Sequence, residues 1–318
     1  MTIGHHLDAL HGLPAYTFPG PEHRPRPVEP DAVAWRVSAD VYDANENWTD
    51  AFARFCATVD TTRVRALTVG AWEEAYDTAP TSVIEALTAA RDRLPALRAL
   101  FLGDMVGEEC EISWINQSDV TPLLAAFPRL EELGVRGGSG LRFPALSHGA
   151  LRRLVIETGG LPAEVVRGVG GSDLPALEHL DLWLGTPEYG GDSEAADLAP
   201  ILSGARLPNL RHLAVRNSEM QDAVAAAVAS APVVARLEVL DLSMGVLTDE
   251  GAAALLGGQP LTHLKKLDLH HHYLSEPLLE RVRQTLEPAG VEVALDRGDA
   301  EEDAEDDGTV WRYVAVGE

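Results

Sequence analysis

Residues 177–183 read LEHLDLW, with aliphatic side chains at the first, fourth and sixth positions. The same spacing occurs eight times in the chain, and successive starts are separated by 33, 33, 21, 26, 33, 27 and 27 residues. A pattern that recurs at such a period indicates stacked units that each contact only their neighbours, as in a solenoid. The eight stretches begin at Val64, Leu97, Leu130, Leu151, Leu177, Leu210, Leu237 and Leu264.

Helical segments are expected between these stretches. A strand followed by a helix, repeated along the chain, predicts parallel strands joined by right-handed crossovers. Thr121 before Pro122 and a capping box of Ser218 with Gln221 are typical helix starts, and Gly290 is a typical helix end. Further strands are expected at 32–42 and 290–296, and helices at 81–94, 121–127, 197–207, 218–231, 248–256 and 275–290.

The repeats and their helical spacers, such as LTDEGAAALL at 247–256, resemble leucine-rich-repeat proteins of the cytosolic, ribonuclease-inhibitor-like branch. With the acidic run before the final TVWRYVAVGE, the layout also resembles a bacterial, actinobacterial leucine-rich-repeat family. The resemblance covers roughly residues 60 to 296 and implies an α/β, right-handed horseshoe of about eight or nine repeats, with a parallel concave sheet and convex helices. The ninth position, usually Asn or Cys in that superfamily, departs from the pattern and holds Trp72, Met105, Gly138, Gly159, Gly185, Ser218, Gly245 and His272.

We expect one structural domain with four segments. Residues 1–45 would form an N-terminal cap with the first strand, 46–296 the solenoid, 297–308 an acidic linker and 309–318 a strand-like tail. The tail alternates apolar residues, so it would either cover the last exposed edge of the solenoid or bind a partner. Terminal repeats need covering, which favours the first alternative.

Composition restricts the class of protein. The formal net charge is −25, from 25 basic and 50 acidic residues, which argues against nucleic acid and anionic membranes as partners. Two cysteines are too few for a disulfide framework. The N-terminus lacks the basic and apolar regions of a signal peptide, so we expect a cytoplasmic protein. Two lysines against 23 arginines, together with the alanine and glycine content, indicate either a GC-rich bacterial genome or a salt-adapted proteome.

Positions three, five and seven of each stretch point to the face of the sheet opposite the helices. In the middle of this face an exposed Trp183, ringed by arginine and acids, predicts a protein-binding hot spot. The alternative is that Trp183 packs on a neighbouring side chain and that the charges pair across strands. The predicted partner-binding residues on the sheet are Phe101, Arg136, Arg153, Glu157, Asp181, Trp183, His212, Arg216, Asp268 and His270.

Three loops that follow strands at one edge of the sheet carry further candidates. Residues 70–77 hold Trp72 and Tyr76, 103–119 hold Trp114, and 185–197 hold Tyr189. Loops on a rigid scaffold often carry function, so Trp72, Trp114 and Tyr189 join the predicted partner-binding set. Alternatively, these aromatic side chains fold back onto the edge of the solenoid.

The histidine run at 270–272, two residues after Asp268, raises the possibility of a metal site. Consecutive residues point in different directions, so the three histidines are not expected to converge on one ion. A zinc site would need Asp241, Asp268 and His270 with a fourth ligand that the sequence does not indicate. We therefore expect a polar surface without metal or cofactor, and keep a metal- or small-molecule-binding accessory protein centred on these residues as the alternative.

The sequence contains no G-x-S-x-G, H-E-x-x-H or P-loop motif. The glycine-rich stretches 135–143 and 168–174 lack phosphate-loop spacing and are predicted to be repeat turns. Glu108 and Glu109 beside Cys110 would raise the pKa of its thiol, the wrong direction for a nucleophile. The predicted function is a non-enzymatic scaffold or adaptor that binds a partner protein on the concave sheet and rim loops.

Overall fold

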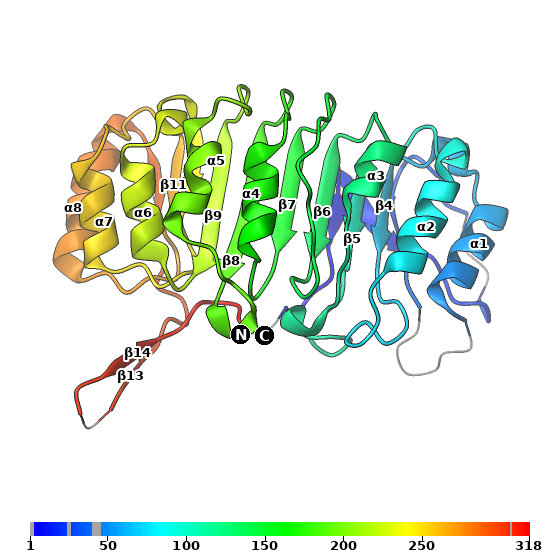
Figure 1. Ribbon diagram of the computed structural model, residues 1–318, viewed down its shortest axis with the longest axis horizontal. Helices are drawn as coiled ribbons and strands as arrows, with labels where there is room; N and C mark the ends of the chain where they lie inside the picture. Colours follow the sequence, from blue (N-terminus) through cyan, green and yellow to red (C-terminus); the bar gives the residue numbers. More distant parts are fainter. Residues whose placement is uncertain (1–2, 24–26, 40–45, 306) are drawn as a thin grey trace.

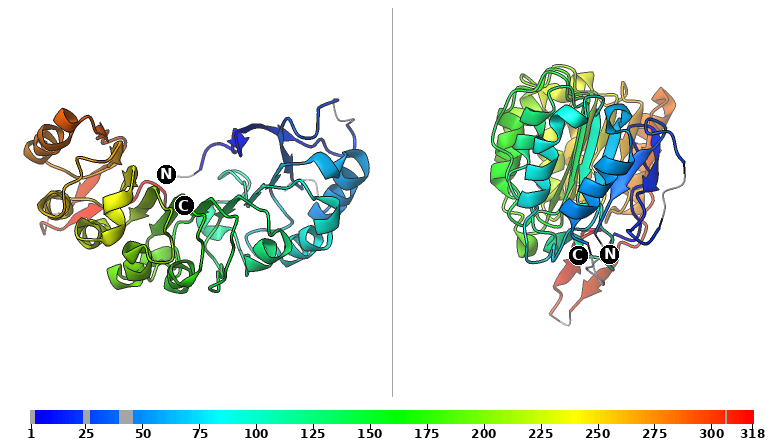
Figure 2. Two further views of the ribbon diagram at one scale, coloured as in Figure 1. Left: turned by 90° about the horizontal axis from the view of Figure 1, so that it is seen from above. Right: turned by 90° about the vertical axis from the view of Figure 1, so that its right-hand side faces the viewer.

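The computed structural model describes residues 3–23, 27–39, 46–305 and 307–318. It is a mixed α/β structure whose twelve-stranded sheet follows the order of the chain, antiparallel between β1 and β2 and parallel from β2 to β12. Helices cover one face of the sheet, and the view from above is an arc with the helices outside (Figures 1 and 2). This arrangement is consistent with an α/β solenoid.

The eight repeated stretches form eight consecutive strands, as predicted. Their third positions pair in one continuous register, so that His179 of β8 lies beside Arg153 on one side and His212 on the other. The sheet strands are β1 Ala9–Leu10, β2 Leu13–Thr17, β3 Ala34–Val37, β4 Ala66–Val69, β5 Ala99–Leu102, β6 Glu132–Arg136, β7 Arg153–Glu157, β8 His179–Gly185, β9 His212–Ser218, β10 Val239–Asp241, β11 Lys266–Asp268 and β12 Glu292–Ala294. The strands expected at 32–42 and 290–296 are β3 and β12, although residues 40–42 lie outside the described part of the chain.

The core lies between the sheet and the helices. Leucines at the fourth position, such as Leu154, Leu180 and Leu213, are fully buried and adjacent across β7, β8 and β9. The helices are α1 Trp48–Thr58, α2 Thr81–Ala89, α3 Thr121–Ala126, α4 Ala163–Gly171, α5 Ala199–Ser203, α6 Gln221–Ala229, α7 Asp249–Gly257 and α8 Glu276–Leu286. Within the described residues, no helix is both long and apolar enough to cross a membrane.

Two local predictions are wrong. The glycine-rich stretch 168–174 is not a turn, because Gly168 and Gly170 lie inside α4. A Cβ at Gly168 would clash with the carbonyl of Phe143, so the glycines allow the helix to approach its neighbours closely. Ser218 does not form a capping box, since it ends β9 and α6 begins after Met220. The expected helix end at Gly290 is confirmed by its left-handed φ of 86°.

The chain ends depart furthest from expectation. The acidic segment contains a strand, β13 (Glu302–Ala304), which pairs antiparallel with β14 (Val310–Arg312) in a separate hairpin. β14 therefore does not cover β12, the end of the large sheet, and Asp306 of the predicted linker lies outside the described residues. At the other end, β1 and β2 lie in the predicted cap, of which residues 1–2, 24–26 and 40–45 are not described.

Candidate functional site

We call the side of the sheet opposite the helices the concave face, and the side where the parallel strands end the carboxyl edge. In the first half of the concave face, arginines and acids form one buried chain. Arg36 Nε lies 3.2 Å from Asp104 Oδ2, and Arg136 bridges Asp104 at 3.5 Å and Glu157 at 2.8 Å. Asp104 is fully buried, so these cations compensate a charge that would otherwise be costly. Arg136 and Glu157 are therefore engaged within the chain.

Arg216 is the centre of the second half. Its Nε and Nη2 donate to the two carboxylate oxygens of Asp181 at 3.0 and 2.6 Å, and its Nη1 lies 3.4 Å from Asp241. The guanidinium also stands 5.2 Å from the centre of the Trp183 ring. Asp181 holds the pKa of Arg216 above its ordinary value despite burial. Asp181, Trp183 and Arg216 therefore lie together, as predicted, but their charged groups and ring already interact with one another.

Trp183 is buried, and the expectation of an exposed indole is wrong. Only 6% of the residue is accessible, because the two ends of the chain meet over it. Ile3 from the N-terminus and Val316 from the C-terminus share an apolar cluster with Trp183, Ile112 and Met244. Figure 1 shows the two ends side by side at the carboxyl edge. The alternative, in which Trp183 packs on neighbouring side chains, describes this geometry.

Residues 313–316 are held along the carboxyl edge by hydrogen bonds to their backbone groups. Asn217 Nδ2 donates to the carbonyl of Val316 at 2.6 Å, and the amide of Val316 donates to Asn217 Oδ1 at 2.9 Å. The amide of Ala315 donates to the carbonyl of Met244, and the Tyr273 hydroxyl contacts both the amide and the carbonyl of Tyr313. Asn217 was not among the predicted site residues, because its partner lies 99 residues away in the chain.

An N-terminal segment covers the first half of the concave face. Leu10 packs with Ala66 and Phe101, and the amide of Leu7 donates to Asp104 at 3.0 Å. His6 lies 2.7 Å from Glu109. Phe101 is consequently only 3% exposed, so this predicted binding residue is also part of a core.

The open part of the concave face centres on two histidines. The rings of His179 and His212 are 3.8 Å apart, and Arg153, which also pairs with Glu132 at 3.2 Å, donates to His179 Nδ1 at 3.0 Å. Burial, then the charge of Arg153, lowers the pKa of His179 to about 2. Burial lowers the pKa of His212 to about 4 although Asp241 opposes the shift. Both imidazoles are therefore neutral near pH 7.

The histidine run does not converge, as expected. His270 Nδ1 contacts Asp268 at 2.7 Å, while His271 and His272 contact the carbonyls of Tyr313 and Leu295. Burial opposes the shift, but hydrogen bonds from His270 and then from Lys266 hold the pKa of Asp268 below its ordinary value. Across the described residues, no group of three or more His, Cys, Asp or Glu side chains is arranged to hold a metal ion. The expected polar surface is wrong here, because Asp268, His271 and His272 are 8%, 6% and 1% exposed. Asp268 is the centre of a largely buried ion-pair network with Lys266 and His270.

The loops at the carboxyl edge divide into buried and exposed aromatic residues. Trp72 is 2% exposed and donates from Nε1 to the carbonyl of Thr78, so it folds back onto the edge. Tyr189 is partly buried, and its hydroxyl donates to Glu318 at 2.7 Å. In contrast, Tyr76 is 62% and Trp114 is 56% exposed. Their loops are adjacent, because the amide of Asn116 donates to the carbonyl of Ala75.

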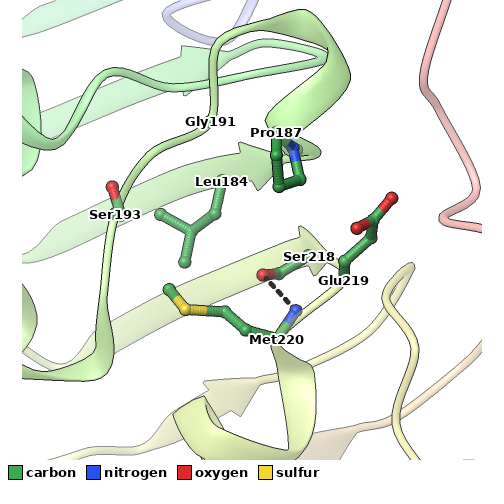
Figure 3. Close-up of a pocket in the computed structure, with 8 residues that line it drawn as sticks. Leu184, Pro187, Gly191, Ser193, Ser218, Glu219 and Met220 are labelled. Carbon is green, nitrogen blue, oxygen red and sulfur yellow. Dashed lines mark hydrogen bonds between the residues drawn. The ribbon is translucent and has the colours of Figure 1, made fainter.

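A shallow pocket of about 290 Å³ lies at the carboxyl ends of β8 and β9. Figure 3 shows Leu184, Pro187 and Met220 lining it, with Ser218 and Glu219 as polar neighbours. Burial, and then the charge of Glu188, raises the pKa of Glu219. The sequence did not indicate this pocket, because its walls come from two repeats.

Cys110 is a buried thiol without the features of a nucleophile. Burial, followed by the charge of Glu111, raises its pKa to about 11. The direction agrees with the prediction, although the main cause is burial and not the charge of Glu108 or Glu109.

The chain was compared with known proteins. No family model and no curated protein matches it. It is similar to a Bacteroides fragilis protein whose crystal structure was a Northeast Structural Genomics Consortium target, at 30% identity and a TM-score of 0.76, covering 84% of this chain and 74% of that one. The chain belongs to the same family as that protein.

Proposed function

We propose that the chain is a non-enzymatic scaffold of the leucine-rich-repeat type, a cytoplasmic horseshoe of eight or nine units, that binds a partner protein at its carboxyl edge. The observation that carries this proposal is the distribution of exposed apolar side chains. Tyr76, Trp114, Val310, Trp311 and Tyr313 are the large apolar residues that the described part of the chain leaves exposed, and all of them belong to segments at this edge.

Comparison with the concave face supports the edge as the binding surface. Trp183 and Phe101 are buried there, and Arg216, Asp181 and Arg136 are engaged in ion pairs. A partner would gain little from groups that are already satisfied. Exposed aromatic side chains, however, are enriched among the residues that dominate protein interfaces, because they bury a large area at a small entropic cost.

Affinity capture from a lysate of the cells that make the protein tests the proposal. The wild-type chain would be compared with a Tyr76→Ala/Trp114→Ala variant, which removes two exposed rings on adjacent loops without changing core residues. A matched control is Arg281→Ala/Gln284→Ala, which shortens two exposed side chains on α8. We expect one or more proteins to be retained by the wild type and the control and depleted at least tenfold with the aromatic variant.

Equal recovery by all three chains would place binding elsewhere and contradict the proposal. So would the absence of any protein enriched over empty resin.

A further inference from the structure

The β13–β14 hairpin stands apart from the sheet that forms the body. It is a separate two-stranded sheet with Asp303 opposite Trp311 and Ala304 opposite Val310, and it projects from the carboxyl edge (Figure 1). Residues 301–305 are all exposed. An isolated two-stranded hairpin is marginally stable in water, so a partner that adds contacts to it would stabilise it.

The two faces of the hairpin differ. Arg312 faces the body, because its guanidinium stands 5.5 Å from the centre of the Tyr273 ring while it pairs with Glu302 at 2.6 Å. Side chains alternate along a strand, so Trp311 and Tyr313 belong to the opposite, outward face. They are 52% and 51% exposed. We call this the outward aromatic face.

Acids frame both rings of the outward aromatic face. Trp311 Nε1 donates to Glu305 Oε1 at 2.8 Å, and the Tyr313 hydroxyl donates to Asp303 Oδ2 at 3.0 Å. Residues 296–307 contain eight acids and one arginine. A guanidinium above an indole with carboxylates at its margin gains both a cation–π contact and charge-assisted hydrogen bonds. Lysine could supply the charge, but its ammonium lacks the planar stacking surface.

The base of the hairpin is fixed. The Tyr273 hydroxyl contacts the backbone of Tyr313 on both sides, and Asn217 holds Val316 three residues later. The outward aromatic face is therefore presented at a defined position relative to the body.

We propose that the outward aromatic face docks an extended, arginine-rich segment of a partner protein, with arginines over Trp311 and Tyr313 and their charges on Asp303 and Glu305. The inference rests on the proposed function in placing partner binding at the carboxyl edge. It adds the chemistry of the partner, since the acidic frame repels acidic segments and favours basic ones. An extended segment also fits because either free edge of the hairpin can accept a further strand.

Fluorescence anisotropy with the full chain tests this inference. The probe is a labelled nine-residue peptide in which arginine alternates with valine, and a peptide with glutamate in place of arginine is the matched negative. We expect the arginine peptide to bind and the glutamate peptide not to bind. Trp311→Ala and, separately, Asp303→Asn/Glu305→Gln should each weaken binding about tenfold. Higher salt should weaken binding further.

Arg281→Ala/Gln284→Ala on α8 is the control, because both side chains are exposed and belong to another element. It should leave peptide affinity unchanged. Unchanged circular dichroism of each variant verifies folding. Affinity that depends on the acids but not on Trp311 would overturn the inference by showing only unspecific attraction, and so would absence of binding. Either result would leave the proposed function standing if capture still depended on Tyr76 and Trp114.

Discussion

Two tryptophans with similar neighbours have opposite environments. Trp183 on β8 has Asp181 and Arg216 close by and is 6% exposed, whereas Trp311 on β14 has Glu305 and is 52% exposed. The difference lies in which segments of the chain pack over each indole ring. Both chain ends pack over Trp183, while Trp311 belongs to a two-stranded ribbon that has the body on its other face. An aromatic residue ringed by charge is thus core in one place and surface in another, and distant segments decide which.

The largest expected effect is a difference in the free energy of unfolding between variants of these two tryptophans. Trp183→Ala should lower the free energy of unfolding by about 3–5 kcal/mol, because it leaves a cavity among Ile112, Met244 and Val316. Trp311→Ala should change it by no more than about 0.5 kcal/mol, since little of its contact area is lost. Urea unfolding followed by circular dichroism measures both. Similar values for the two variants would show that the tail does not cover Trp183 in solution.

A smaller loss of stability is expected when the arginine near each tryptophan is removed. Arg216→Ala would leave Asp181, which is 4% exposed, and Asp241, which is 7% exposed, without their shared cation. We expect a loss of about 2–3 kcal/mol in the free energy of unfolding, the range for charged hydrogen bonds at buried groups. Arg312→Ala on the hairpin is the matched comparison and should cost less than about 1 kcal/mol, because its pair with Glu302 is more exposed. Equal losses would mean that solvent reaches both pairs.

The repeat spacing was sufficient to predict the strands, their parallel order and most helices, because a periodic core depends on residues close together in sequence. Prediction failed where distant segments meet. Nothing near Trp183 indicates that Ile3 and Val316 cover it, and nothing near Gly168 indicates that the carbonyl of Phe143 leaves no room for a Cβ on that helix. For the candidate site, the sequence predicted that Asp181, Trp183 and Arg216 lie together on the sheet, as they do, but it predicted an exposed Trp183, which is buried.

The β13–β14 hairpin was not predicted for a related reason, since its first strand depends on pairing with residues further along the chain. A run of carboxylates predicts a solvated segment, and residues 301–305 are indeed exposed. Their strand exists because Trp311 and its neighbours pair with Asp303 and Ala304 across the turn. Local charge thus predicted the exposure of this segment and not its conformation.

The smallest expected effect is on how the free energy of unfolding depends on pH. It concerns His179 and His212, which stack on the open part of the concave face. Their pKa values, about 2 for His179 and about 4 for His212, are below the unfolded value, which is about 6.5. Between pH 6.5 and 4 the unfolded chain binds protons that the folded chain does not, so the free energy of unfolding falls as pH falls.

Each such histidine contributes at most about 1.4 kcal/mol per pH unit, and partial exposure of both rings reduces this. We therefore expect the His179→Gln/His212→Gln variant to lose about 1 kcal/mol less than the wild type between pH 7 and pH 5. The groups that face the pair, Glu132, Arg153, Arg216, Asp241 and Lys266, are unchanged in the variant, so their own titration cancels in the difference. Urea unfolding at several pH values measures it. Parallel curves for the two chains would mean that the imidazoles are hydrated, and the open part of the concave face would then resemble the hairpin more than it resembles the core around Trp183.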